Sequence, residues 1–566
     1  MLQASHSMID RAVRSGIFAE PARRARSAGR CGFMRRRWYM AVALVGAGCM
    51  LFPALGRIPV RRQQEARVLL VARDMARGGS WIVPHFRGKV RLNKPPLAYW
   101  ITAAAFGLTG RADSAAVGRF PAACAGVATA GMIYAIGAAA HGRRRALVAA
   151  ALGSGCLMFI RGARLAETDV YLCLFTSVAA ACFLSALLRE ESAAQWWMAG
   201  GMASGLAFLA KGPAALLPVI TAAAAVALDR RRRGTRTLTL WGGTVFLAVF
   251  LPALWYLVVI RLPETQSAVE AEVSALLGGT DHPGPWYYYL ARLPVAFIPW
   301  SLFLPFGLVR SFRRSFHNRA ERFILLWWGV TFVALSLLRN KQQHYAMLLL
   351  PSTAILSAPI ACRAIGDRGT WRGHWARWYL AILCAAGATL GAGLAVAASF
   401  KEVAAPEVIP LAVGLVFLPA LAALGLLRRR PAAALGAMVM TIAAAAWMYA
   451  AVLVRYVVAE SVFPELARRA RSLMDERYRL YAAGARLGAL AFYLDRPFSE
   501  VPVDAIERLR LGREEALLVY ERCQRIVTPP DAEAAVRLCR HGYCGVLFVA
   551  SDAVGRSLPS GHNRSQ

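Results

Sequence analysis

The chain has 566 residues, of which 57% are hydrophobic and only 17% are charged. Its 67 basic and 32 acidic side chains give a formal net charge of +35. Soluble domains carry about 25% charged residues, so a string of soluble domains is excluded, and the apolar content excludes an intrinsically disordered chain. The basic residues lie in short clusters between long apolar stretches. This pattern indicates a polytopic membrane protein and argues against a nucleic-acid-binding protein.

The N-terminal segment, residues 1–37, holds nine Arg and two acidic residues and has no apolar core. The apolar segment Trp38–Leu55 follows it directly. No small-residue cleavage site is evident between the two. We therefore predict a basic cytoplasmic segment followed by a first membrane span that is retained in the protein.

Thirteen further apolar segments follow, and Arg-rich loops alternate with Arg-poor loops from residue 143 onward. The segments lie near residues 97–110, 114–140, 146–160, 170–188, 195–210, 213–228, 238–260, 290–309, 323–338, 345–362, 378–399, 408–427 and 432–454. The positive-inside rule then places the N-terminus in the cytoplasm and the tail outside. For this orientation to hold, one of the two segments 97–110 and 114–140 does not cross the membrane fully. Residues 97–110 would make a helix of only about 21 Å, which is shorter than the hydrocarbon core. We predict about 13 transmembrane helices.

A long outer loop, residues 57–96, is not apolar. Apolar residues from Val68 to Met75 recur there at helical spacing, with Arg and Asp residues between them. The spacing predicts an amphipathic helix over Gln63–Gly78 that could lie on the membrane surface.

The tail, residues 456–566, mixes short apolar runs with charged helical stretches, which predicts a small α/β domain outside the membrane. The apolar runs are Leu480–Ala483, Ala516–Tyr520 and Gly545–Ala550, and one charged stretch is Glu465–Arg477. Two of Cys523, Cys539 and Cys544 could pair in an oxidising compartment, and the sequence leaves open which two. The predicted organisation is thus a cytoplasmic segment (1–37), a transmembrane domain (38–455) and a C-terminal domain (456–566).

Lysine is rare, with five residues against 62 arginines, and two lysines share a context. Lys94 precedes Pro95-Pro96, Lys211 precedes Gly212-Pro213, and each leads into an apolar segment. Because Pro favours the first helical position, each Lys is expected beside a helix N-terminus, where an anion is stabilised. A single such Lys is more commonly a snorkelling side chain. Two such lysines on the outer side make the binding of a lipid-linked phosphate as good an explanation as snorkelling.

Acidic residues near the outer side form a second group. Glu167 and Asp169 precede the 170–188 segment and follow Arg164. An acid at this position is commonly a helix N-cap, but an ionisable group at a membrane boundary also marks functional sites. Glu65 and Arg67 are an acid–base pair in the outer loop, where a solvated helix face is the simpler interpretation.

Two histidines open apolar segments from the outer side. His282 begins a run of Trp and Tyr residues typical of an interfacial aromatic belt, and His344-Tyr345 begins another segment. A lone histidine at such a boundary is more commonly hydrogen-bonded than a metal ligand. No zinc-hydrolase or nucleotide-binding motif is present in the sequence.

Nine short motifs occur in order over residues 64–351. They are Gln64–Arg67, Arg73–Met75, Trp81–His85, Asn93–Trp100, Arg119–Pro121, Glu167–Asp169, Lys211–Pro213, His282–Tyr289 and His344–Pro351. This series resembles the bacterial protein O-mannosyltransferase-like glycosyltransferases, a family that includes the aminoarabinose transferases of lipid A modification.

The resemblance implies a GT-C fold, all-α and polytopic, in the bacterial inner membrane, with an active site on the periplasmic face. It implies that a sugar passes from a polyprenyl-phosphate donor, with inversion, to lipid A, a glycolipid or a protein. The partners would be this donor, the acceptor and the bilayer, without nucleic acid. A lipid or solute transporter (or flippase) and a non-catalytic lipid-binding relative stay open as alternatives.

The resemblance also implies roles for single residues. Lys94, Tyr345 and Arg67 would approach the donor phosphate, and the anion-site argument adds Lys211. Asp169 would be the catalytic carboxylate.

Two positions depart from the family pattern. Gln64 stands where the family has the first Asp of its outer-loop motif, so Glu65 or Asp169 would serve as the general base. Asn93 replaces the acid that precedes the Lys-Pro-Pro motif in the aminoarabinose branch and that could hold a metal with His282. The metal ligands are therefore unknown, and a divalent metal stays an open alternative. Further residues that could bind substrate are Arg164, Glu167, His282 and His344.

Overall fold

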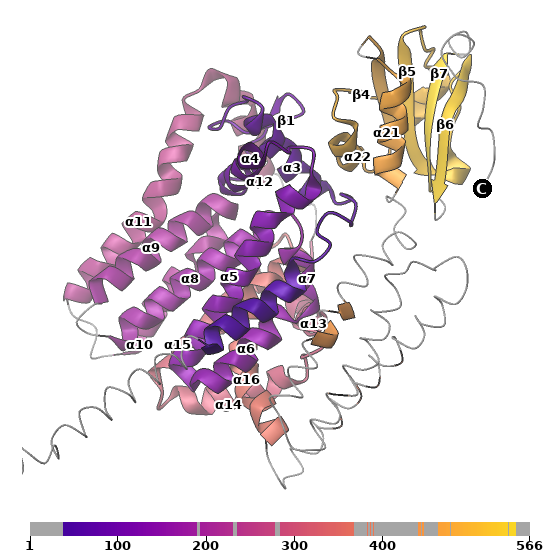
Figure 1. Cartoon of the computed structure of the whole chain (residues 1–566). Coiled ribbons are helices and arrows are strands. Elements are labelled where there is room, and N and C mark those ends of the chain that lie inside the picture. Colours follow the sequence, from indigo (N-terminus) through magenta and orange to yellow (C-terminus); the bar gives the residue numbers. More distant parts are fainter. Residues whose placement is uncertain are drawn as a thin grey trace, which may run out of the picture.

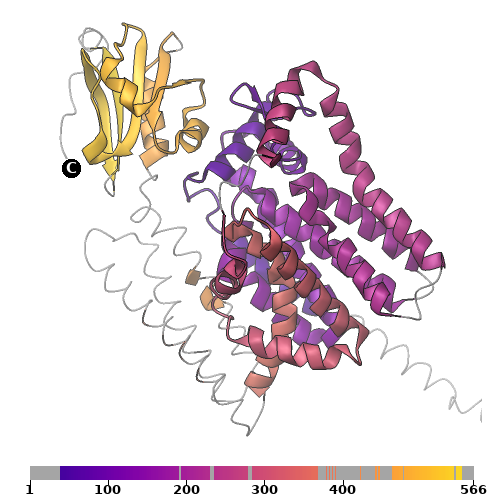
Figure 2. The same cartoon turned by 180° about the vertical axis from the view of Figure 1, so that it is seen from behind.

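The structure is a computed structural model. It describes residues 38–189, 193–229, 235–277, 283–366, 462–475, 477–540 and 543–550, together with a few single positions between 378 and 445. The predicted segment 1–37, the spans predicted within 378–454, and His282 lie outside the described residues. Figures 1 and 2 show a helical bundle and a separate sheet-containing C-terminal region.

The bundle is built from apolar helices that pack on one another. In chain order they are the helix Trp38–Leu51, α5 (Ala115–His141), α6 (Arg143–Ser154), α7 (Leu157–Ala163), α8 (Thr168–Leu188), α9 (Ala193–Lys211), η1 (Pro213–Leu216), α10 (Leu217–Leu228), α11 (Thr235–Ile260), α12 (Gln266–Leu277), α13 (Tyr288–Ala296), α14 (Phe303–Ser315), α15 (Arg319–Leu337), η4 (Gln343–Leu349) and α16 (Leu350–Gly366). Within the described residues, five helices are long and apolar enough to cross a membrane, or six if the bent pair α6–α7 counts as one span. These repeated spans indicate a multi-pass membrane protein.

Two predicted spans are interrupted in the structure. Residues 146–160 form the helices α6 and α7, which meet at an angle of 69° because Cys156 has an extended backbone. Residues 290–309 are divided between α13 and α14, and Pro294 and Pro299 lie in this stretch. Proline removes a backbone donor and disfavours a continuous helix, so the single helix predicted for 290–309 was wrong.

The outer loop forms a small layer at one end of the bundle. It contains α3 (Gln63–Ala76), the short strands β1 (His85–Phe86) and β2 (Lys89–Val90), and α4 (Leu97–Thr109), a helix of 13 residues. The apolar face of α3, from Val68 to Met75, is buried in a cluster with Tyr99 and Phe106 of α4 and with residues of the C-terminal region. The apolar face of α3 is therefore covered by other parts of the protein, whereas the sequence suggested that this face could lie on the membrane surface.

The C-terminal region contains a mixed five-stranded sheet in the order β4-β3-β5-β7-β6. Its elements are α21 (Phe463–Leu473), β3 (Arg479–Gly484), α22 (Leu487–Leu494), β4 (Ser499–Glu500), β5 (Glu515–Arg522), β6 (Ala532–Arg540) and β7 (Tyr543–Ala550). β3 is parallel to β4 and β5, whereas β7 is antiparallel to β5 and β6. The three predicted apolar runs lie in β3, β5 and β7, so the α/β class of this region is confirmed.

The cysteines of this sheet come together at Cys544. Its sulfur lies within bonding distance of both Cys523 and Cys539. One sulfur forms a single disulfide, so the structure narrows the pairing to two alternatives. The Cα atoms of Cys523 and Cys544 are 5.1 Å apart and those of Cys539 and Cys544 are 4.0 Å apart. The first distance lies in the usual range for disulfides, which favours Cys523–Cys544.

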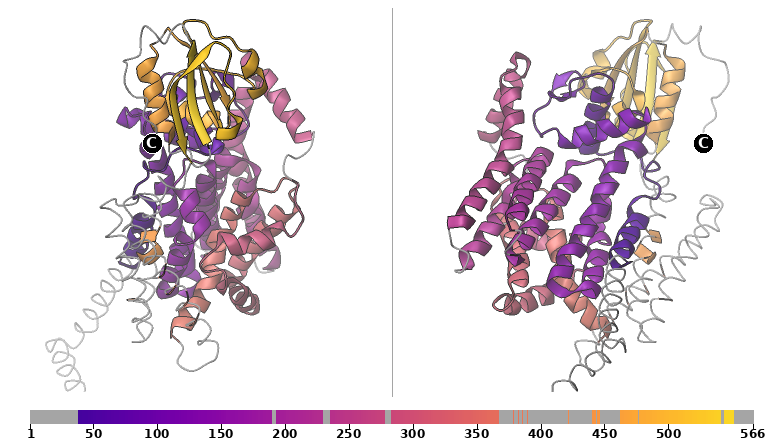
Figure 3. Two further views of the ribbon diagram at one scale, coloured as in Figure 1. Left: turned by 90° about the vertical axis from the view of Figure 1, so that its right-hand side faces the viewer. Right: turned by 60° about the vertical axis from the view of Figure 1, so that its left-hand side comes forward.

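Acids of the C-terminal region hold the outer loop. Arg77 donates to both carboxylate oxygens of Asp495 at 2.7 and 2.8 Å, and Arg73 donates to the same carboxylate at 3.0 Å. Arg87 of the loop also pairs with Glu500 at the sheet edge. Figures 1 and 3 show α22 beside α3 at this end of the bundle. Helix α3 is therefore held in place by a part of the chain that is remote in sequence.

Asp495→Asn is expected to lower the free energy of unfolding by about 1–3 kcal/mol, because the variant removes a charge that two guanidinium groups share. Asn tolerates the left-handed backbone at this position (φ 52°). Thermal unfolding of the detergent-purified protein would measure the effect. The matched control is Asp475→Asn, since Asp475 is exposed and pairs only locally with Arg477. Equal changes in the two variants would contradict a docking role for Asp495.

Candidate active site

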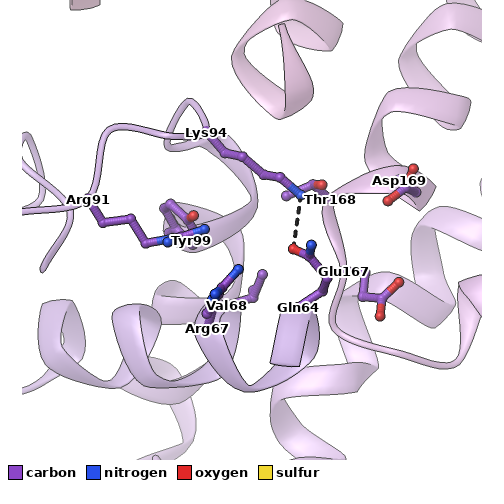
Figure 4. Close-up of a pocket in the computed structure, with 9 residues that line it drawn as sticks. All are labelled: Gln64, Arg67, Val68, Arg91, Lys94, Tyr99, Glu167, Thr168 and Asp169. Atoms are coloured by element: carbon purple, nitrogen blue, oxygen red, sulfur yellow. Dashed lines mark hydrogen bonds between the residues drawn. The ribbon is translucent and has the colours of Figure 1, made fainter. Parts of the chain in front are cut away.

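A small pocket lies where α3, the loop before α4 and the start of α8 meet (Figure 4). Its lining residues are Gln64, Arg67, Val68, Arg91, Lys94, Tyr99, Glu167, Thr168 and Asp169. All of them except Val68 carry a polar or charged side-chain group, so the lining suits a polar, charged ligand group.

Lys94 reaches into this pocket from the loop that precedes α4. Its Nζ atom donates to Oε1 of Gln64 at 3.2 Å, so the residue that replaces the family acid gives Lys94 a neutral acceptor. Burial, together with the nearby Lys211, lowers the pKa of Lys94 to about 8. An anion bound beside Lys94 would therefore strongly stabilise the charged form of this lysine.

Asp169, in α8, lies close to residues of two further elements. It forms an ion pair with Lys211, and its Oδ2 atom lies 3.9 Å from Nε2 of His344. The Nζ atom of Lys211 lies 4.6 Å from the ring centre of Tyr345. Helices α8 and α9 and the segment η4 thus bring four predicted site residues together, with Asp169 facing the pocket.

Both lysines lie just before the start of an apolar helix, as predicted. Lys211 is the last residue of α9, and Pro213 is the first residue of the apolar helix Pro213–Leu228, whose first turn is the 3-10 segment η1. Lys94 precedes α4, where Pro96 is the N-cap and not the first helical residue.

Glu167 is the N-cap residue of α8 and lines the pocket, but its side chain makes no capping hydrogen bond. It pairs instead with Arg62, which stands just before α3, at 2.7 Å. Burial raises the pKa of Glu167 to about 7, although Arg62 acts in the opposite direction. Glu167 therefore changes charge near neutral pH.

The stability of the protein should depend on pH through Glu167. Because the pKa of Glu167 is higher in the folded state, the folded protein binds the carboxyl proton more tightly than the unfolded chain does. This proton binding stabilises the fold fully below about pH 4.5, and the stabilisation is lost as the pH rises through 7. The melting temperature of Glu167→Gln minus that of the wild type should therefore grow between pH 5 and 8. The partly exposed Glu465, which pairs with Arg468 and Arg469, offers a control, and Glu465→Gln should show a flat difference. A flat difference for Glu167→Gln would contradict the assignment.

Five of the predicted site residues that the structure describes lie outside the pocket lining: Glu65, Arg164, Lys211, His344 and Tyr345. Glu65 is fully buried and forms a two-point ion pair with Arg119, with N···O distances of 2.6 and 3.0 Å. Arg164 donates to backbone carbonyl groups at the end of the first helix, among them that of Met50 at 3.0 Å. Both residues hold the structure around the pocket and have no place in its lining.

Sequence reasoning missed Arg91, which lines the pocket opposite α8. The available signal was its position three residues before Lys94. It also missed Arg62, the partner of Glu167, because no local pattern links residues that are 105 positions apart.

Among the described residues, the pocket does not gather a set of metal ligands. Asp169 and His344 approach each other, but Asp169 is engaged by Lys211, and the Nη2 atom of Arg91 donates to Oδ1 of Asn93. In the same part of the chain, the one group of three or more His, Cys, Asp or Glu side chains at metal-ligand spacing is the cysteine trio of the C-terminal sheet.

The comparisons with known proteins agree with the resemblance seen in the sequence. Residues 93–256 match the family described as dolichyl-phosphate-mannose-protein mannosyltransferase. An undecaprenyl phosphate-alpha-4-amino-4-deoxy-L-arabinose arabinosyl transferase of Pseudomonas fluorescens is 27% identical over 57% of this chain and 59% of its own length. The corresponding transferase of Edwardsiella ictaluri is 28% identical over 56% of this chain and 58% of its own length. The matched region thus spans about three fifths of these curated relatives.

A solved structure extends the likeness to most of the chain. ArnT from Cupriavidus metallidurans, crystallised with undecaprenyl phosphate, superposes with a TM-score of 0.69 at 20% identity. The superposition covers 90% of this chain and 97% of ArnT. The chain therefore has an ArnT-like GT-C fold, and the predicted family resemblance is confirmed.

Proposed function

We propose that this chain is an integral membrane glycosyltransferase that transfers a sugar from a polyprenyl-phosphate donor to an acceptor of the cell envelope. The observation that carries the proposal is the pocket itself, whose lining contains both Lys94 and Asp169, with Lys211 paired to Asp169. Cations for a phosphate and a carboxylate for a proton are the two requirements of such a transfer. The relatives that use undecaprenyl phosphate by name support this reading.

The finer topology belongs to the same proposal. Segment 1–37 lies in the cytoplasm, residues 38–455 make about 13 crossings, and residues 456–566 form a periplasmic domain. The pocket then faces the periplasm, because α3 and α22 lie at its end of the bundle. Lipid A, the acceptor suggested by the lipid A branch of the family, is the first acceptor to test.

The reaction is a single displacement at the anomeric carbon. Asp169 accepts the proton of the acceptor hydroxyl while the acceptor oxygen bonds to the anomeric carbon. The bond between that carbon and the phosphate oxygen breaks, and the electron pair leaves with the polyprenyl phosphate. Lys94, Lys211 and Tyr345 stabilise the negative charge that develops on the phosphate. Attack opposite the leaving group inverts the anomeric centre.

Mass spectrometry of envelope lipids and glycoproteins from a deletion strain would test the function. We expect the loss of a mass equal to one sugar residue, and its return when the wild-type chain is supplied. An unchanged sugar content, together with altered passage of a lipid or solute across the membrane, would favour a transporter. Binding of the donor lipid without its consumption would favour a non-catalytic relative. This alternative is worth testing because Gln64 stands where the family has an Asp.

A further inference from the structure

The cations that line the pocket fall into two groups. The ammonium group of Lys94 points toward Gln64 and the start of α8, where Asp169 lies (Figure 4). The guanidinium groups of Arg67 and Arg91 lie on the other side of the pocket, beside Tyr99 (Figure 4). One small pocket therefore has two separate centres of positive charge.

The second centre lacks a carboxylate partner among the described residues. The Nε–H groups of Arg67 and Arg91 are both buried and donate to no acceptor in the part of the chain that the structure describes. Within the described ranges, Arg91 hydrogen-bonds only to neutral groups, namely Oδ1 of Asn93 and the side chain of Tyr99. Burial and the neighbouring Arg91 both lower the pKa of Arg67, as expected for like charges held close together without a counterion.

The two acids that line the pocket are already engaged. Glu167 pairs with Arg62 outside the pocket lining, and Asp169 pairs with Lys211. Buried charges are costly unless they are paired. The Arg67–Arg91 centre therefore remains available for an anion that the ligand brings.

The donor phosphate does not account for both centres. A sugar linked to a polyprenyl monophosphate carries one negative charge on the phosphate, and the proposed function already assigns Lys94, Lys211 and Tyr345 to that charge. A cationic amino sugar beside Arg67 and Arg91 would be repelled. A guanidinium pair instead suits a planar carboxylate, which can accept two parallel hydrogen bonds from one fork.

We propose that Arg67 and Arg91 form a second anion site that binds a carboxylate on the transferred sugar, so that this enzyme transfers an acidic sugar of the hexuronic acid class. The inference rests on the proposed glycosyltransferase function and assigns Arg67 to the sugar rather than to the phosphate. The same chemistry could come from a phosphate group on the acceptor, and the experiment separates the two sources.

The test uses the full-length protein in vesicles with three polyprenyl-phosphate donors that carry a hexuronic acid, the matched neutral hexose, or an amino-pentose. For the wild type we expect kcat/KM to be at least tenfold higher with the hexuronic acid than with the hexose, and lowest with the amino sugar. Arg91→Gln should lower kcat/KM about 10–100-fold with the hexuronic acid and less than threefold with the hexose. Lys89→Gln, at an exposed position of the same loop, is the matched control and should leave the donor preference unchanged.

Equal use of acidic and neutral donors by the wild type would overturn the inference while leaving the glycosyltransferase function intact. A rise in the KM for the acceptor in Arg91→Gln, with the donor preference unchanged, would also overturn it and would assign the site to an acceptor phosphate. A wild-type protein that consumes none of the three donors would overturn the glycosyltransferase proposal and this inference with it. Thermal unfolding of each variant identifies any loss that comes from misfolding.

Discussion

Asp169→Asn is expected to lower kcat for sugar transfer by about 10²–10⁴-fold, the range that a positioned general base contributes. The carboxylate faces the pocket at the start of α8 and is held by Lys211. Asn has nearly the same shape but cannot accept the acceptor's proton at neutral pH. A steady-state transfer assay with a polyprenyl-phosphate sugar would measure the loss.

A second variant guards against misfolding, because Asp169→Asn also removes a buried ion pair. Lys94→Ala should lower kcat by about 10²–10³-fold, since one cation no longer stabilises the leaving phosphate. Asp229→Asn is the matched control, because Asp229 caps the end of α10 and pairs with Arg319 rather than with pocket residues. Full transfer by both Asp169→Asn and Lys94→Ala would refute the proposed site.

Glu65→Gln is expected to destabilise the protein by about 3–5 kcal/mol, because it leaves the guanidinium of Arg119 buried without its counterion. Both side chains have no exposed surface. Thermal unfolding and the amount of protein recovered from membranes would report this loss. By contrast, the transfer activity per folded molecule should change little, because Glu65 does not line the pocket.

The double variant Glu65→Met/Arg119→Met separates a structural from a catalytic role. Replacing both partners of a buried pair by apolar residues is often tolerated, so we expect the double variant to be more stable than Glu65→Gln. Transfer activity in the folded fraction would then show that Glu65 is not the base. A normally folded Glu65→Gln protein with kcat reduced as far as in Asp169→Asn would contradict this view.

Regular patterns were the parts of the fold that could be predicted from the sequence. Helical spacing over Gln63–Gly78 corresponds to α3, and the three apolar runs of the tail correspond to β3, β5 and β7. The convergence of Lys94, Asp169, Lys211 and Tyr345 followed from the order of the family motifs. The helix and the strands follow from local periodicity, and the grouping of site residues follows from several motifs taken together. Both kinds of signal are present in a single sequence.

Features that depend on long-range pairing could not be predicted. Glu65 looked like a candidate base, because nothing near it shows that Arg119 lies against the same face of α3. Arg91 had no distinguishing neighbour except Lys94. The break between α13 and α14 is different, because Pro294 and Pro299 gave a local signal for it that the hydropathy of the segment does not report.

The pairing of the outer loop with Asp495 has a consequence for the order in which the protein is made. Arg73 and Asp495 are 422 residues apart, and a chain is synthesised from its N-terminus. Helix α3 is therefore complete on the ribosome long before its acidic partner exists. A partly synthesised chain consequently lacks the contacts of Arg73 and Arg77 with Asp495, and α3 gains this support only after the C-terminal region has been made.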